Sequence, residues 1–183
     1  MNQRLAWIDL EMTGLDPKKE AILEVACLIT DNDLNLIAQA PTYVVKPSQQ
    51  FLDAMQPIVR DMHTKSGLLA DVAASNYTCA HVEKQLLMFL AQHCQPQTAP
   101  LCGNSIWMDK FFIKESMPTL YDFFHYRTID VTTIKELVKR WYPHNQQANF
   151  AKKNTHRALQ DIEESINELR YYRKHFFKKA DWA

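Results

Sequence analysis

Two carboxylates, Asp9 and Glu11, stand two residues apart in the apolar stretch Trp7-Ile8-Asp9-Leu10-Glu11. In a β-strand, residues at this spacing point to the same face of the sheet. Two like charges so placed repel each other and resist desolvation, so a buried pair persists when a cation, an arginine or a proton compensates it. The pair indicates either a metal site or two acids on the solvent face of an edge strand. The metal site requires further carboxylates elsewhere in the chain.

Later segments supply groups of the required types. Asp109 lies in a helical segment that follows Gly103-Asn104-Ser105, and His156 and Asp161 stand at the start of a long C-terminal helix. Five helical positions separate these last two side chains by about 140°, so Asp161 can face the sheet while His156 reaches in from the frayed first turn. Taken singly, each has an ordinary explanation, as an acid near a helix N-terminus, an exposed acid or a surface histidine.

The elements that must position these groups follow from periodicity and turn residues. Strands are expected around residues 7–12, 21–30, 36–45, 99–102 and 127–130, and the first three predict an antiparallel meander. Helices are expected from Thr78 to before Pro96, from about Ser105 onward, from an N-cap at Thr132 or Thr133 to Pro143, and from near Thr155 toward Phe176. Residues 47–65 and 143–154 are expected to be irregular. This order predicts an α/β fold with a mixed sheet.

Length and composition limit the class of protein. With 183 residues and 46% hydrophobic content, the chain is expected to form one domain over residues 1–183. Because the first apolar segment contains two acids and no run approaches ~18 apolar residues, we expect a soluble cytoplasmic protein. The four cysteines (Cys27, Cys79, Cys94 and Cys102) form no C-x-x-C pair and are expected to be buried, reduced thiols rather than disulfides or a zinc site.

The charge is balanced overall but unevenly distributed. Residues 1–132 contain 10 basic and 15 acidic side chains, and residues 133–183 contain 11 and 6. A protein that grips long duplex DNA is normally strongly basic. A nucleic-acid partner should therefore be short, with bound cations replacing part of the lysine and arginine charge.

In combination, the order D-x-E, then Gly-Asn-Ser before a helix with Asp, then H-x-x-x-x-D resembles the DEDDh branch of 3′–5′ exonucleases. Within that branch the whole length is similar to the oligoribonucleases, in the segments 8–16, 102–105, 125–127, 130–131 and 171–173. The resemblance implies a ribonuclease H-like mixed β-sheet flanked by α-helices. The chain departs from the family at Gln56-Pro57-Ile58-Val59, where a tryptophan is frequent, and at Thr132, where a serine is common.

The resemblance also implies a reaction and its cofactors. Two divalent cations, Mg²⁺ or Mn²⁺, would be held by four carboxylates, whose charge offsets the +4 of the ions: Asp9, Glu11, Asp109 and Asp161. Asp9 would bridge the two ions. His156 would serve as the general base for the attacking water, a role that suits an imidazole.

Very short RNAs, down to dinucleotides, are the substrates that the resemblance implies. Leu15 would act as a wedge between bases, and Ser105, Thr132 and His63 would lie near the far phosphate. Tyr126 and Arg127 would reach the active site from the other subunit of a homodimer.

Two alternatives remain open. A proofreading-type or tRNA-trimming enzyme of the same branch would need an extended basic stripe or a docking tail to hold longer strands. A non-catalytic nucleic-acid-binding domain on the same fold would lack at least one of the five motif residues, and all five are present.

Overall fold

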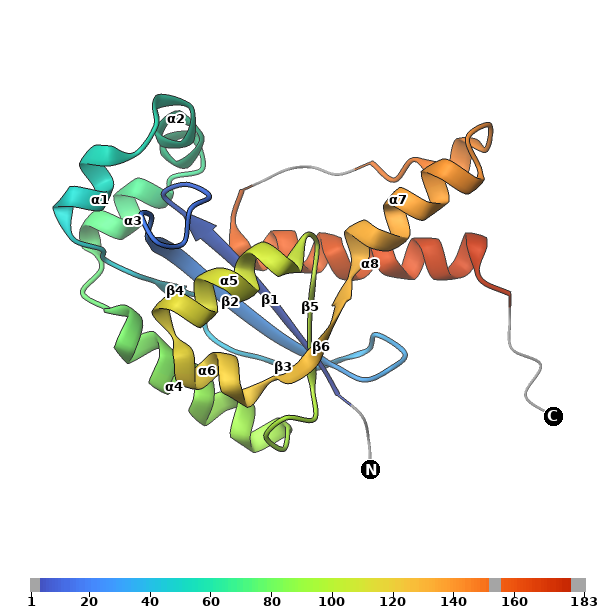
Figure 1. The fold of residues 1–183 in the computed structure, drawn as a ribbon, viewed down its shortest axis with the longest axis horizontal. Helices are drawn as coiled ribbons and strands as arrows, with labels where there is room; N and C mark the ends of the chain where they lie inside the picture. Colours follow the sequence, from blue (N-terminus) through green and yellow to red (C-terminus); the bar gives the residue numbers. More distant parts are fainter. Residues whose placement is uncertain (1–3, 152–155, 179–183) are drawn as a thin grey trace.

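The computed structural model describes residues 4–151 and 156–178. A six-stranded sheet with the order β3-β2-β1-β5-β6 forms its centre, and β4 also pairs with β2 (Figure 1). β1 (Leu5–Met12), β2 (Ile22–Thr30) and β3 (Leu36–Gln39) are consecutive antiparallel neighbours. The predicted meander is therefore confirmed.

The other half of the sheet is parallel. β5 (Pro100–Gly103) pairs with β1, and β6 (His125–Asp130) pairs with β5. The mixed sheet of the predicted α/β fold is thus confirmed as well.

The expected strand over 36–45 is wrong as a single element. It divides into β3 and β4 (Tyr43–Val44), and both pieces pair with β2. Pro41 lies in the break, and because proline has no backbone N–H to donate, a continuous ladder is not available there.

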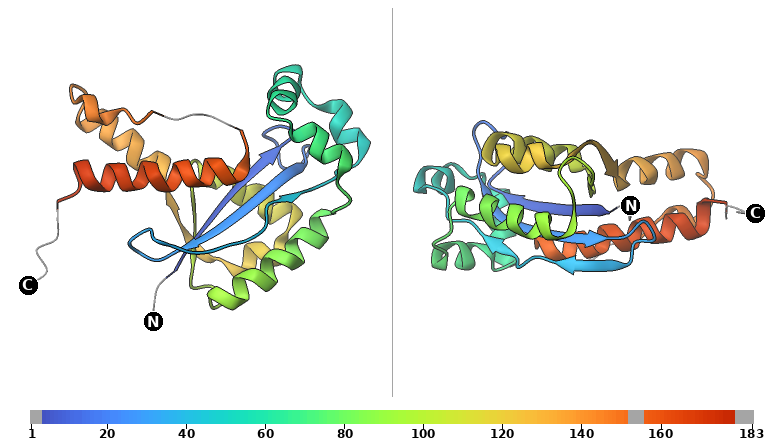
Figure 2. Two further views of the ribbon diagram at one scale, coloured as in Figure 1. Left: turned by 180° about the vertical axis from the view of Figure 1, so that it is seen from behind. Right: turned by 90° about the horizontal axis from the view of Figure 1, so that it is seen from below.

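Helices cover both faces of the sheet. α4 (Cys79–His93), α5 (Ile106–Ser116) and α6 (Pro118–Phe123) share one core with the sheet, whereas α8 (Ala158–Phe176) contributes to a second core. The right-hand view of Figure 2 shows α5 and α8 on opposite sides of the strands. α6 has no counterpart among the predicted helices.

Alternate residues of β1 supply the two cores. Ile8 and Leu10 belong to the core beneath α5, whereas Trp7 belongs to the core beneath α8. Since the side-chain period of a strand is two residues, Asp9 and Glu11 share the face of Trp7. Both carboxylates therefore point to the α8 side.

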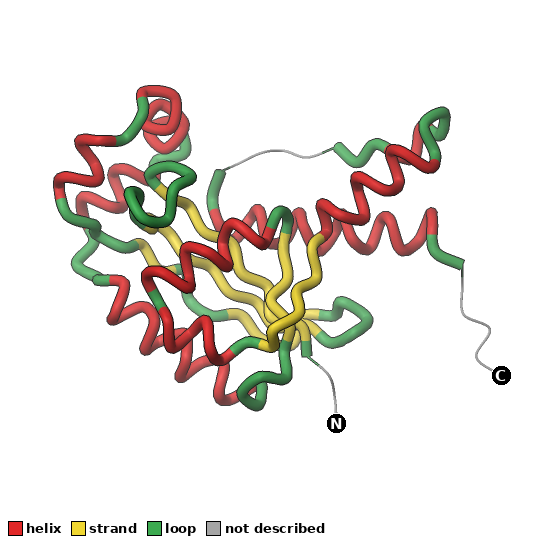
Figure 3. The backbone as a smooth tube through the Cα atoms, viewed as in Figure 1, coloured by secondary structure: helices red, strands yellow, loops and turns green. Residues whose placement is uncertain are grey.

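The segment predicted to be irregular up to residue 65 is helical instead. It contains α1 (Gln49–Ala54), α2 (Pro57–Lys65) and, just beyond, α3 (Leu68–Ala74), which gather beyond the end of the sheet at which β1 ends (Figure 3). The prediction failed because helices of six to nine residues show little periodicity by themselves. Their apolar side chains instead pack together in a small core that includes Leu23 and Met55.

Two predicted helix starts also need correction. α7 (Val131–Trp141) begins earlier than expected, because the Asp130 side chain, rather than Thr132 or Thr133, accepts the capping hydrogen bond. α8 begins at Ala158, and Thr155 lies outside the described residues. The expected loop after Pro143 contains a short 3₁₀ turn, Gln146–Ala148. Within residues 4–151 and 156–178, no helix is both long and apolar enough to cross a membrane.

Candidate functional site

The second half of β1 concentrates acidic side chains on one face of the sheet. Asp9 is half-buried, and Glu11 is buried with 8% of its surface exposed. The antiparallel register places Glu24 of β2 directly opposite Glu11. Because residues opposite each other in a ladder point to the same face, three carboxylates crowd the space beneath the start of α8.

Asp109 approaches β1 from α5. Its Oδ1 accepts a hydrogen bond of 3.0 Å from the backbone N–H of Leu10, the residue between Asp9 and Glu11. Pairing between β1 and β5 covers Ala6 and Trp7 only, so the edge of β1 farther along is open to a side chain. Asp109 satisfies the amide there, and this contact fixes its position relative to the two carboxylates of β1.

His156 and Asp161 complete the cluster from the α8 side. Ligand-capable atoms of Glu11, His156 and Asp161 all lie within 4.8 Å of one another. His156 precedes α8 and has a left-handed backbone with φ +53°, so the predicted position in the first helical turn is wrong. The surrounding pocket of about 240 Å³ is lined by Asp9, Leu10, Glu11, Asn104, His156, Asp161, Glu164 and Ser165.

Burial and mutual repulsion make these carboxylates unusually basic. Burial, with added repulsion from Asp161, Glu24 and Asp109, raises the pKa of Glu11 from 4.5 to about 8. Burial also raises the pKa of Asp109 from 3.8 to about 7, although the Leu10 amide opposes the shift. Carboxylates with pKa values raised this far have too little positive charge nearby to stabilise their ionised forms. A site of hard oxygen ligands with such a deficit fits divalent cations.

His63, on α2, contacts the same cluster. Its Nε2 lies 2.8 Å from the carbonyl oxygen of Met12, and its Nδ1 lies 3.8 Å from Oε2 of Glu11. Because a carbonyl only accepts, Nε2 carries the proton and Nδ1 presents a lone pair. Burial lowers the pKa of this imidazole and favours its neutral form. His63 therefore lies beside the carboxylates as a neutral ring.

Ser105 and Thr132 lie together in a polar network beside the pocket. The Ser105 amide donates to Oδ1 of Asp130 and to Oγ1 of Thr132, at 2.9 Å each. The Thr132 hydroxyl in turn donates to Oδ1 of Asn104 at 3.1 Å. Asn104 lines the pocket and thereby connects the Ser105–Thr132 pair to the carboxylate cluster.

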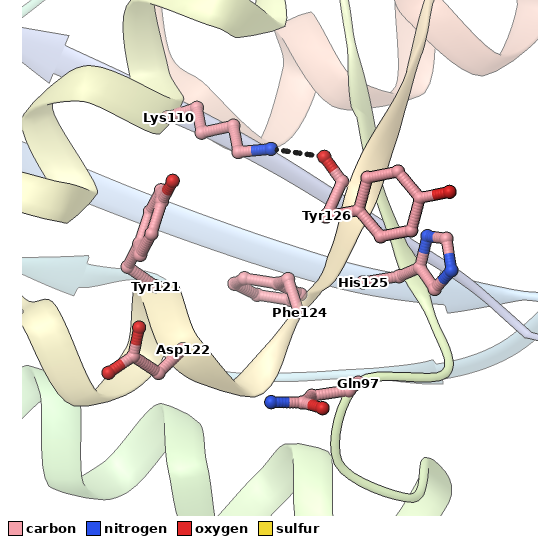
Figure 4. Close-up of a pocket in the computed structure, with 7 residues that line it drawn as sticks. All are labelled: Gln97, Lys110, Tyr121, Asp122, Phe124, His125 and Tyr126. Atoms are coloured by element: carbon pink, nitrogen blue, oxygen red, sulfur yellow. Dashed lines mark hydrogen bonds between the residues drawn. The ribbon is translucent and has the colours of Figure 1, made fainter.

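The remaining predicted residues lie apart from the carboxylates. Leu15 follows β1 in an exposed loop, with 72% of its surface accessible. Tyr126 and Arg127 lie near the start of β6, whereas Asp130, which contacts Ser105, ends that strand. Figure 4 shows Tyr126 and His125 at a different hollow, where the ammonium of Lys110 donates to the Tyr126 carbonyl. The Arg127 guanidinium lies 5.2 Å from the centre of the Tyr126 ring.

Sequence reasoning missed several residues around the pocket. Asn104, Glu164 and Ser165 line it, and Glu24 is paired in the ladder with Glu11, which also lines it. Glu24 had a usable signal, since it is the only charged residue in the strand Ile22–Thr30. An acid in such an apolar strand requires compensation. Glu164 and Ser165 had no comparable signal, because polar residues on a helix normally face water.

The chain is similar in sequence to known exonucleases. A family model described as Exonuclease (RNase_T) matches residues 6–169. The oligoribonuclease of Thiobacillus denitrificans is 50% identical over 174 residues, covering 95% of each chain. The mitochondrial oligoribonuclease of Mus musculus is 47% identical over 179 residues, covering 98% of this chain and 76% of the mouse protein.

Solved structures show the same fold at low sequence identity. Exonuclease I from Methylocaldum szegediense superposes with a TM-score of 0.72 at 19% identity. Escherichia coli exonuclease I, in complex with a 5cy-dT13 oligonucleotide, superposes with a TM-score of 0.73 at 13% identity. This chain is covered to 96% in both comparisons but spans only 41% and 42% of those longer chains.

Proposed function

The chain belongs to the oligoribonuclease family of exonucleases, and from this premise we propose that it hydrolyses very short RNAs from the 3′ end. Dinucleotides are its preferred substrates and 5′-mononucleotides its products. The observation that carries the proposal is the cluster of Glu11, His156 and Asp161 beside Asp9 and Asp109. Crowded carboxylates can supply oxygen ligands for divalent cations, and the His156 imidazole beside them can accept a proton from water; metal-dependent phosphodiester hydrolysis uses both kinds of group.

Four carboxylates would hold the cations, namely Asp9, Glu11, Asp109 and Asp161. Two Mg²⁺ or Mn²⁺ ions bound there would stabilise negative charge on the attacking and leaving oxygens of an in-line displacement. Asp9 and Glu11 would hold the cations from the same face of β1, since both carboxylates line the pocket. His156 is assigned as the general base that accepts a proton from the attacking water, and its exposed ring can pass that proton to solvent.

Substrate binding is assigned to residues around the rim. His63, Ser105 and Thr132 would contact the phosphate farther from the cleaved bond, and Leu15 would separate the bases. The positions of these residues support the assignment of His63, Ser105 and Thr132. His63 contacts Met12 and Glu11, and Asn104 connects Ser105 and Thr132 to the pocket.

Tyr126 and Arg127 would act across the two-fold interface of a homodimer. Both residues lie near the start of β6, whereas Asp130 ends that strand. We therefore assign them to the catalytic site of a second subunit. The exposed Tyr126 ring could stack on a base, and the guanidinium of Arg127 could hold a phosphate. Together they would close the pocket behind two nucleotides. We also propose that the protein is located in the cytoplasm.

The function is tested by a time course on RNAs of two to seven nucleotides, with Mg²⁺, with Mn²⁺ and with a chelator. We expect dinucleotides to be hydrolysed fastest and the chelator to stop the reaction. Faster hydrolysis of the longer RNAs would favour the proofreading-type or trimming alternative. Binding without hydrolysis under every condition would favour the non-catalytic domain.

A further inference from the structure

Glu24 is a fully buried carboxylate on β2 whose two oxygens are both occupied by groups at the start of α8. Its Oε1 accepts hydrogen bonds from Nε and Nη2 of Arg157, at 3.0 and 2.6 Å. Its Oε2 accepts from the backbone N–H of Ala158 at 2.7 Å. The carboxylate thus binds the side chain of one residue and the main chain of the next.

The contact to Ala158 replaces the usual helix cap. Arg157 occupies the N-cap position of α8, and its side chain makes no capping hydrogen bond. The first amides of a helix have no partner within the helix, and the N-terminal end of its dipole favours a negative charge. Glu24 supplies both the acceptor and the charge from a neighbouring strand, so the start of α8 is fastened to β2.

Arg157 has a second set of contacts that extends this attachment. Its Nη2 lies 2.9 Å from Oδ2 of Asp71 on α3, and its Nη1 donates to the carbonyl oxygen of Ser66 at 3.4 Å. The planar guanidinium therefore connects α8 to β2 and to the helices beyond the end of the sheet. Its orientation is fixed by three acceptors, the carboxylates of Glu24 and Asp71 and the carbonyl oxygen of Ser66.

His156 directly precedes this attachment and has the left-handed backbone with φ +53°. A residue other than glycine keeps such a conformation only when its surroundings impose it. The imidazole must nevertheless lie beside Glu11 and Asp161. Anchoring Arg157 and Ala158 to Glu24 fixes the C-terminal side of His156 relative to the strand that carries Glu11, since Glu24 and Glu11 are paired in the ladder.

We propose that Glu24 and Arg157 are a positioning pair that holds His156 at the carboxylate cluster. The inference rests on the proposed function, in which His156 is the general base. The pair itself contacts neither substrate nor reacting atoms and acts through the backbone of residues 156–158. A displacement of about 1 Å in a general base is sufficient to lower turnover on the order of 100-fold.

The main test is a double-mutant cycle between Arg157→Ala and His156→Ala, measured as Mg²⁺-dependent dinucleotide hydrolysis. In the parent chain, we expect Arg157→Ala to lower kcat roughly 10- to 100-fold and to change KM less than about 3-fold. In the His156→Ala background, the same substitution should lower kcat less than about 3-fold, because the group being positioned is already absent. Equal losses in both backgrounds would overturn the proposal.

Two further variants separate positioning from general destabilisation. Arg157→Lys keeps the charge that compensates buried Glu24 but cannot reproduce the forked contact, so it should fold and lose kcat by roughly 3- to 10-fold. Leu90→Ala removes a buried side chain of α4, leaves a cavity and should lower the melting temperature. At a temperature where this variant is folded, its kcat should stay within about 2-fold of that of the parent. A similar kcat loss in Leu90→Ala would show that reduced stability alone explains the effect.

A readout without turnover distinguishes failure of the inference from failure of the proposed function. Glu11→Gln should displace the NMR signal of the His156 ring in the metal-free parent chain, because the two side chains are neighbours. In the Arg157→Ala background, Glu11→Gln should leave that signal in place. An equal displacement in both backgrounds would refute the positioning role whatever reaction the protein catalyses, whereas absence of dinucleotide hydrolysis by the parent chain would refute the proposed function.

Discussion

The backbone amide of Leu10 donates to the carboxylate of Asp109 at 3.0 Å, and this single hydrogen bond connects two segments that are 99 residues apart in sequence. Leu10 lies between Asp9 and Glu11, so the bond places a third carboxylate against the strand that carries the other two. The contact exists where β1 extends beyond its pairing with β5. Asp109 therefore has a structural role in addition to its proposed role as a ligand.

Substitutions at Asp109 should separate these two roles. Asp109→Asn keeps an oxygen that can accept from Leu10, so its stability should stay close to that of the parent while hydrolysis is lost. Asp109→Ala leaves a buried amide without its partner and should be destabilised by about 1–3 kcal/mol relative to Asp109→Asn. Denaturant unfolding and dinucleotide hydrolysis measure the two effects, and equal stability of both variants would contradict the structural role.

Asp9→Ala should abolish nearly all hydrolysis and leave the fold intact. Removing the Asp9 carboxylate takes away one of the proposed cation ligands and also relieves repulsion with Glu11. Without metal, the melting temperature should therefore equal or exceed that of the parent chain. Hydrolysis of dinucleotides by Asp9→Ala at a rate near that of the parent would refute the metal assignment.

The stability of the metal-free protein should decrease as the pH rises from about 4.5 to about 8, because burial raises the pKa of Glu11 over that interval. The folded state retains the Glu11 proton where the unfolded state has lost it. The stabilisation is complete below the unfolded pKa and disappears as the pH rises through the folded pKa.

The comparison with Glu11→Gln isolates this effect. The difference in unfolding free energy between the parent and Glu11→Gln should change with pH by up to ~1.4 kcal/mol per unit within that window. Thermal or urea unfolding in the presence of a chelator provides the measurement. A pH-independent difference would show that Glu11 ionises normally in the folded chain.

His156→Ala should lower turnover by roughly 10² to 10⁴-fold with little change in Mg²⁺ affinity, as expected for a general base. The nearness of His156 to Glu11 and Asp161 leaves a competing role as a ligand. Calorimetric titration of Mg²⁺ into the variant separates the two roles. A large loss of Mg²⁺ affinity would reassign His156 to the metal site.

Mixing Asp9→Ala with Arg127→Ala protein should restore activity if Arg127 acts on the neighbouring subunit. A heterodimer then contains one site with intact carboxylates and an intact arginine from its partner. After random exchange of equal amounts, about a quarter of the parent activity is expected. Absence of recovery, once subunit exchange has been demonstrated with tagged chains, would place the role of Arg127 within its own subunit.

Local sequence patterns were sufficient for the main elements of the fold. Apolar alternation around Asp9 and Glu11 predicted β1, and three- to four-residue periodicity predicted α4 through Val82, Leu86 and Leu90, all of which are buried. Such patterns are informative because they are properties of short segments. The order of acidic motifs also indicated the family to which the chain belongs.

Only the tertiary structure decided how the candidate site is assembled. Asp109 contacts β1 because β5 leaves that edge of the strand open, and His156 has a left-handed backbone beside residues that are attached to Glu24. Both arrangements depend on partners that are distant in sequence, so no local pattern contains them. The helices of residues 49–74 form for the same reason, since six- to nine-residue helices gain their stability from the shared core around Leu23 and Met55 rather than from their own propensity.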